Sequence, residues 1–312
     1  MKKLVVLFVS VIFASCSQEQ VGSVNSISEP SLSVLDGKLL SYKDDASFIK
    51  EYSTLSEMKD KKEIQTWISK KGLKSFLNVS DTNEELQDSI ISINRIIYSD
   101  ALKSILNSES KFKINGKVIW LYERNLFVLT QKQIYNSILE LKTNKNDLEV
   151  YGRISNLNSN QKSNKINSRS IIPNENRIKT FVNYLPDSKR NILNLYNETV
   201  VINDNIVSSK MFLESIFQYR SCSFWRCTWK NSTENCLINN YSFCNSCGFD
   251  GDWISNYIAS DLFSGSKTFL IATWTGGTPP KITGYSNYVV SGTIRWQTAS
   301  NMYSYEIPIS WY

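Results

Sequence analysis

Hydrophobic and polar residues alternate along the C-terminal end of the chain. In residues 288–297 one face collects the hydrophobic side chains Tyr288, Val290, Ile294 and Trp296. Residues 303–311 repeat the pattern with Tyr303, Tyr305, Ile307, Ile309 and Trp311. A period of two is typical of strands with one buried face. We therefore expect residues 178–312 to form an antiparallel, β-rich, sandwich-like domain, with Pro308 placing the last strand at an edge.

The first half of the chain has a helical period instead. Its clearest stripe has spacings of three or four and consists of Leu86, Ile90, Ile93, Ile97, Ala101 and Ile105. This spacing predicts one helix, opened by the capping-box residues Thr82 and Glu85. Asp44 or Asp45 should cap an earlier helix, and Gly72 should end another.

A β-meander follows these helices. Asn115-Gly116 is the favoured two-residue hairpin turn, and a second turn is expected near Arg124-Asn125. Residues 34–154 are therefore predicted to be an α+β domain with a three-stranded meander. With its β-rich C-terminal part, the whole chain is expected to belong to the α+β class.

Positive charge gathers in the middle of the chain, which carries a formal net charge of +6. Between Ser155 and Arg190, seven Lys or Arg residues face only Glu175 and Asp187. Such a polar, basic run is typical of a solvated linker, which we place at residues 155–177. Contact with acidic lipid headgroups or polysaccharide remains an alternative. No nucleic-acid partner is expected, because no binding motif accompanies the charge.

The N-terminus has the pattern of an export signal. Lys2 and Lys3 precede a hydrophobic run over residues 4–14, which is shorter than the about 20 residues that cross a bilayer as a helix. The segment Phe13-Ala14-Ser15-Cys16 resembles a lipobox, with phenylalanine where leucine is usual. That resemblance implies removal of residues 1–15 and acylation of Cys16, which anchors the chain in a membrane.

Residues 16–33 would then be a polar tether, and the expected location is the cell envelope, as an outer-membrane lipoprotein facing the periplasm or the surface. Plain secretion and an uncleaved anchor are the alternatives.

The N-terminal quarter of the chain resembles uncharacterised surface lipoproteins of the Bacteroidota. In those proteins a strand with a Asp-Gly-Lys-Leu motif precedes an acidic helix cap and a helix carrying tryptophan and phenylalanine. The matching residues are Asp36, Gly37, Leu39, Tyr42, Asp45, Phe48, Trp67 and Phe76. The resemblance implies an exported, lipid-anchored protein and supplies no catalytic residue.

Five cysteines crowd into a segment that we expect to be a loop. They are Cys222, Cys227, Cys236, Cys244 and Cys247. In an exported protein this density favours disulfides, so we expect two bridges and one leftover thiol, of undetermined pairing. A zinc or other metal site and fully reduced thiols are the alternatives.

The chain contains no histidine. Its absence excludes Ser-His-Asp and Cys-His catalysis and histidine-ligated zinc. No phosphate-binding glycine loop is present, and we expect no cofactor. These absences favour a non-catalytic binding or structural protein over an enzyme.

Aromatic residues supply the candidate binding site. Trp225, Trp229 and Trp253 lie in or beside the cysteine-rich segment, where they could bind a glycan or a protein, or fill a small core. Asp250 and Asp252 could ligate calcium or act as an acid/base pair. The alternative function is therefore a carboxylate-dependent hydrolase of envelope or host glycans.

Overall fold

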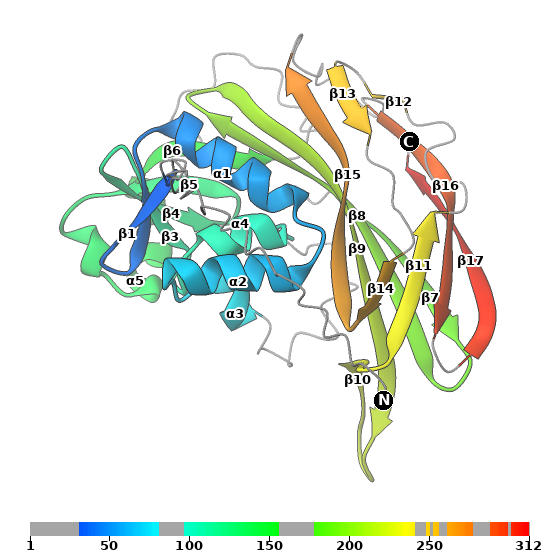
Figure 1. Cartoon of the computed structure of the whole chain (residues 1–312). Coiled ribbons are helices and arrows are strands. Elements are labelled where there is room, and N and C mark those ends of the chain that lie inside the picture. The colour runs from blue at the N-terminus through cyan, green and yellow to red at the C-terminus, as the bar shows by residue number, and fades with distance from the viewer. Residues whose placement is uncertain are drawn as a thin grey trace, which may run out of the picture. The chain divides into compact units, whose positions relative to one another are not determined.

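The computed structural model describes residues 31–80, 97–155, 178–240, 248–249, 252–255, 261–276, 288–298 and 301–311. Among these residues strands far outnumber helices, and no helix begins after residue 147 (Figure 1). The chain is mostly β-structure, so the expected α+β class holds only in part. Among the described helices, none combines the length and the hydrophobicity that crossing a lipid bilayer requires.

The first helix begins, and the second helix ends, where the sequence predicts. The Asp44 side chain accepts a hydrogen bond from the Ser47 amide at 2.8 Å and caps α1 (Asp45–Glu57). Gly72 ends α2 (Lys61–Lys71) with φ of +67°, in the left-handed region. The other elements before residue 80 are β1 (Ser33–Asp36), β2 (Leu39–Tyr42) and α3 (Phe76–Ser80).

The long helix predicted between Leu86 and Ile105 is wrong at its C-terminal end. Residues 97–99 are not helical, and Ser99 begins a separate short helix, α4 (Asp100–Ile105). The Ser99 amide and hydroxyl donate to the Glu198 carboxylate at 2.8 and 2.6 Å. This contact with a distant strand fixes Ser99 in an extended conformation and overrides the helical period. The capping-box residues 82 and 85 lie outside the described residues.

The β-meander is confirmed. Its first turn falls on Asn115 and Gly116, with φ of +50° and +74°. Its second turn falls on Glu123 and Arg124, one residue earlier than expected. The three strands and the elements that follow them are β3 (Lys111–Ile114), β4 (Lys117–Tyr122), β5 (Asn125–Leu129), η3 (Gln133–Tyr135), α5 (Ile138–Thr143), η4 (Lys145–Asp147) and β6 (Glu149–Ser155).

Two long strands, β8 (Lys189–Ile202) and β9 (Asn205–Cys222), contribute side chains to two hydrophobic cores. Val200 and Ile202, at one end of β8, pack with α1, α2 and α4. Further along, Leu193 and Leu195 belong to a second core with the C-terminal strands. β6 pairs with β8, so one sheet contains strands from both sides of the predicted linker at residues 155–177.

Five strands of the C-terminal part form a second sheet, which shares a hydrophobic core with β8 and β9, whereas β13 (Asp252–Ser255) and β15 (Ser266–Gly276) belong to the sheet of β8 and β9. The five are β11 (Asn235–Asn240), β12 (Gly248–Phe249), β14 (Asp261–Ser264), β16 (Tyr288–Thr298) and β17 (Asn301–Trp311). In the described residues this sheet has the order β12-β16-β11-β14, with β17 beside β16 (Figure 1). Ile294 and Trp296 of β16 are buried, as the alternating pattern predicts. Among the described strands, β17, which carries Pro308, pairs only with β16.

The remaining strands are β7 (Ile178–Leu185) and β10 (Cys227–Asn231).

Candidate functional site

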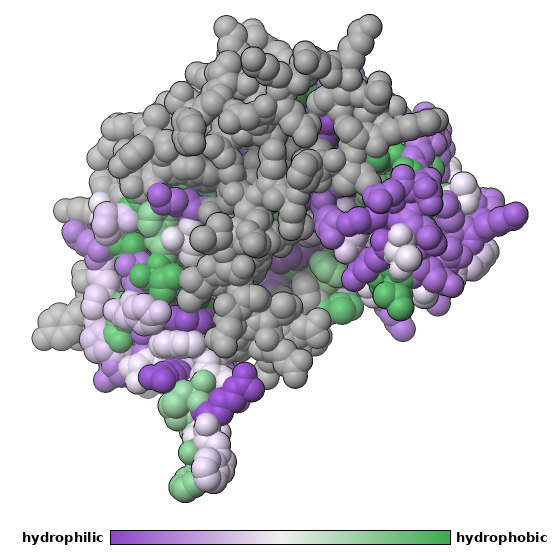
Figure 2. All heavy atoms as spheres, turned by 180° about the vertical axis from the view of Figure 1, so that it is seen from behind, coloured by the Kyte–Doolittle hydropathy of each residue, from purple (hydrophilic) through white to green (hydrophobic). Residues whose placement is uncertain are grey.

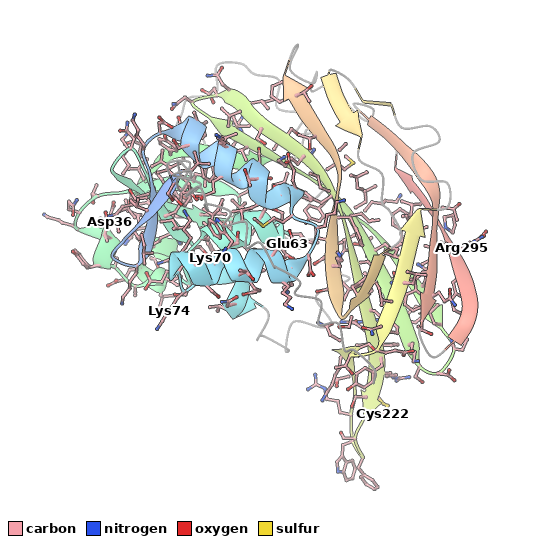
Figure 3. All side chains as sticks on the ribbon, viewed as in Figure 1. Asp36, Glu63, Lys70, Lys74, Cys222 and Arg295 are labelled. Atoms are coloured by element: carbon pink, nitrogen blue, oxygen red, sulfur yellow. A yellow bond between two sulfur atoms is a disulfide. The ribbon has the colours of Figure 1, made fainter. Side chains whose placement is uncertain are left out.

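The candidate site lies at the end of the hairpin formed by β9 and β10. A disulfide joins Cys222 and Cys227, which are opposite each other in the two strands with Cα atoms 4.0 Å apart. The four residues between them make the turn, and the Ser223 amide donates to the Arg226 carbonyl at 2.8 Å. Figure 3 labels Cys222 near the end of this hairpin. We call residues Cys222–Cys227 the aromatic tip.

Two large aromatic side chains stand out at the aromatic tip. Phe224 and Trp225 are each 90% exposed, and they contact each other edge to face with ring centroids 4.8 Å apart. In the space-filling view, the projecting end at the bottom carries hydrophobic and strongly hydrophilic residues side by side (Figure 2). Side chains of this size are usually buried, so their exposure makes the aromatic tip the candidate contact surface.

Trp229 has a different environment from Trp225. It lies in β10 and is partly buried, with the Arg190 guanidinium 4.2 Å from its ring centroid and the Tyr184 ring 6.1 Å away. The Arg190 Nε donates to Gln218 Oε1 at 2.8 Å, which fixes the guanidinium over the indole ring. Trp229 therefore supports the base of the hairpin and is not part of the exposed tip.

The cysteine-rich segment is not one stapled loop. Residues 227–231 and 235–240 form strands β10 and β11, because they pair with β9 and with β16. Trp253 lies in β13, which pairs with β15 and not with the hairpin. The structure thus does not place the three predicted tryptophans in one loop.

The cysteines divide into two environments. The Cys222–Cys227 bridge is the disulfide found among the described residues, whereas Cys236 is a free thiol buried in β11. Burial raises the pKa of the Cys236 thiol to about 12, which keeps it protonated and unreactive. Cys244 and Cys247 lie outside the described residues, so a second bridge stays a prediction.

The predicted carboxylate pair is not tested by the structure. Asp250 lies outside the described residues, and Asp252 begins β13. Within the described ranges, no group of three or more acidic or cysteine residues is arranged to hold a metal ion. Cys16 and residues 156–177 of the basic linker also lie outside them.

Sequence reasoning missed Phe224 and a buried polar cluster. Phe224 could have been found from its place beside Trp225 in the middle of the short Cys222–Cys227 turn. The cluster joins the helices to β8, since the Tyr52 hydroxyl and Ser99 both donate to Glu198, which lies beside Lys210 in the β8–β9 register. The signal for this cluster in the sequence is Glu198, a charged residue within a hydrophobic stretch of strand β8.

Comparisons with known proteins do not indicate a function for this chain. No protein-family model matches the sequence, and no curated protein matches it. Among solved structures, a DUF4848 family protein from Bacteroides thetaiotaomicron aligns with 10% sequence identity and a TM-score of 0.22. That alignment covers 89% of this chain and 98% of the other.

Proposed function

We propose that this chain is an exported protein of the bacterial envelope, anchored by lipid at Cys16, that binds an envelope component without catalysis. The aromatic tip is the contact surface in this proposal. The lipid anchor rests on the sequence around Cys16, and the binding role rests on the described structure of the hairpin.

The observation that carries the binding role is the exposure of Phe224 and Trp225 on a cross-linked turn. Moving such side chains out of water stabilises a complex by about 25 cal/mol for each Å² of apolar surface buried. The Cys222–Cys227 bridge holds the turn in one conformation before the partner arrives, so little conformational entropy is lost on binding. Rigid aromatic side chains of this kind often dominate binding energy.

Export is supported by the same bridge. Disulfides persist in oxidising compartments outside the cytoplasm and are rare within it. A cross-linked, solvent-exposed turn therefore fits a protein whose folded part lies beyond the inner membrane. The mass of the intact native protein tests the anchor, because acylation at Cys16 would add the mass of the fatty-acyl groups to a chain that lacks residues 1–15.

Site-specific photo-cross-linking tests the binding role. A photoreactive amino acid replaces Trp225 in the full-length gene, and intact producing cells are irradiated. We expect cross-linked products from position 225. Leu262, which is 60% exposed on β14, is the matched control position and should give few products.

Equal yields from positions 225 and 262 would contradict a specific contact at the aromatic tip. The chemical class of the captured molecule also separates the alternatives, since a hydrolase would capture its glycan substrate at the site of cleavage and not at a tip that carries no acidic residue.

A further inference from the structure

We propose that the aromatic tip inserts into the headgroup region of an anionic lipid bilayer, giving the anchored protein a second membrane contact. This inference rests on the proposed function and names the partner class of the same surface. Phe224 and Trp225 would enter the interface, and the cationic residues of the hairpin would lie at the level of the lipid phosphates.

The hairpin extends past the strands beside it. The last residue of β9 that pairs with β8 is Tyr219, opposite Lys189, and pairing with β15 stops at Ile216. Beyond Tyr219, β9 pairs only with β10 among the described strands. An isolated two-stranded hairpin is only marginally stable in water, and here the disulfide closes its far end. The fold thus holds two aromatic side chains away from the rest of the sheet.

The charge of the hairpin suits an anionic surface. Residues 217–231 contain Arg220, Arg226 and Lys230 and no acidic residue. All three cations are exposed, and none forms an ion pair in the part of the chain that the structure describes. Long cationic side chains near apolar ones can extend toward phosphates while their neighbours enter the apolar layer. Each such residue near an anionic membrane adds to the attraction, which salt screens.

A glycan fits the aromatic tip less well than a bilayer does. Sugar sites combine an aromatic platform with amide or carboxylate side chains that hydrogen-bond the hydroxyl groups. The amide side chains at the base of the hairpin, Gln218 and Asn231, hydrogen-bond to each other at 3.1 Å and lie away from the turn. The turn itself offers one cation, Arg226, two aromatic rings and Ser223, whose hydroxyl already donates to the Arg226 carbonyl at 3.1 Å.

A protein partner would need more surface than the aromatic tip supplies. Stable protein interfaces bury about 800 Å² on each side. A buried aromatic side chain contributes roughly 150–250 Å², so Phe224 and Trp225 together reach only about half of that area. A bilayer needs no complementary shape and accepts a small convex contact. Because the lipid at Cys16 would keep the protein beside the membrane, a weak second contact is enough.

Quenching of tryptophan fluorescence by brominated lipids tests this inference. The native protein, purified from membranes of the producing cell, is reconstituted into phosphatidylglycerol vesicles whose acyl chains carry bromine near the headgroup. We expect part of the emission of the eight tryptophans to be quenched, and this part to be lost in Trp225→Phe. Trp229→Phe, which changes a partly buried tryptophan of the same hairpin, is the matched control and should keep the quenched component.

Charge is tested in the same assay. Replacing phosphatidylglycerol by phosphatidylcholine, or Arg226 by Gln, should reduce the Trp225-dependent quenching several-fold. Quenching that is identical in the wild type and in Trp225→Phe would overturn the inference, as would quenching that does not respond to lipid charge.

The two proposals can fail separately. If brominated lipid leaves Trp225 unquenched while position 225 cross-links to a protein or glycan in the envelope, the lipid inference falls and the binding role stands. If position 225 neither cross-links above its control nor is quenched, both fall.

Discussion

Lys210 lies fully buried in β9, where its Nζ has no hydrogen-bond partner among the described residues. The centroid of the Tyr52 ring lies 5.8 Å from Nζ, and the carboxylates of Glu57 and Glu198 act on the amine electrostatically. Burial lowers the pKa of the Lys210 amine, and the two carboxylates only partly oppose this shift. The charged amine therefore destabilises the folded state near neutral pH.

Replacing this amine should stabilise the protein. The unfolded chain binds more protons than the folded one between the folded-state pKa of Lys210 and its usual value near 10.5, so this group lowers stability as pH falls through that window. We expect Lys210→Met to raise the free energy of unfolding by about 1–2 kcal/mol at pH 7, with a smaller gain as pH approaches 10.5. Urea unfolding at several pH values measures both.

The control is Lys50→Met, which changes an exposed lysine on α1 and should alter stability by less than about 0.5 kcal/mol. A Lys210→Met protein that is less stable than the wild type at pH 7 would show that the charged amine is needed in the native state.

Single residues were only partly predictable from the sequence. Trp225 was singled out by its place among the cysteines, and the structure leaves it exposed. Trp229 looked equivalent, but its partners Tyr184 and Arg190 come from strands far away in sequence, which no local pattern reveals. The sequence did not reveal the cluster of Tyr52, Ser99 and Glu198 for the same reason, since its members are far apart in the chain.

At the scale of elements, the β9–β10 hairpin depends on its cross-link. A bridge that closes so short a turn stabilises by roughly 2 kcal/mol at most. The end of the hairpin pairs with no third described strand, so its opening need not disturb the two cores. We expect Cys222→Ser/Cys227→Ser to change global stability by less than about 1 kcal/mol and to expose the turn to proteases.

Limited proteolysis with chymotrypsin, read by mass spectrometry, measures this opening. New cleavage after Phe224 or Trp225 should appear at least several-fold faster than in the oxidised wild type. Cys236→Ser, which alters the buried thiol and not the bridge, serves as the control. Equal cleavage rates with and without the bridge would mean that strand pairing alone orders the turn.

Elements were predictable where local chemistry decides them. The Asp44 cap, the Gly72 stop and the Asn115-Gly116 turn each depend on one or two neighbouring residues, and all three are present. The stripe through Ile97, Ala101 and Ile105 failed as one helix because Ser99 hydrogen-bonds a carboxylate 99 residues away. The spacing of hydrophobic residues along the chain gives no information about such tertiary contacts.

At the scale of the whole molecule, the pairing of β6 with β8 joins strands from both sides of the predicted linker. Gly152 permits this pairing, because a Cβ atom there would lie 2.4 Å from the Val201 carbonyl oxygen. We expect Gly152→Ala to destabilise the protein by about 2–3 kcal/mol, since backbone on both strands must shift. Chemical denaturation measures the loss.

Gly72→Ala is the control that separates steric crowding by a new Cβ atom from the backbone strain of replacing a glycine with positive φ. Gly72 has a positive φ, but the nearest atom to a Cβ there would belong to the flexible Leu35 side chain, at 3.8 Å. We therefore expect Gly72→Ala to lower the free energy of unfolding by only about 1 kcal/mol. If Gly152→Ala costs no more than Gly72→Ala, the two strands are not in close contact at this point. The role of Gly152 was not visible from the sequence, because its partner strand β8 lies beyond the linker.

The β8–β9 hairpin also bears on the order in which the chain acquires its structure. Its strands are joined by the two residues Asn203 and Asp204, whereas the parallel pairing of β2 with β3 brings together Ser41 and Lys113. Closing a long loop costs more chain entropy and slows folding. The hairpin can therefore form early as a nucleus on which both cores condense, while the strands nearest the N-terminus join last.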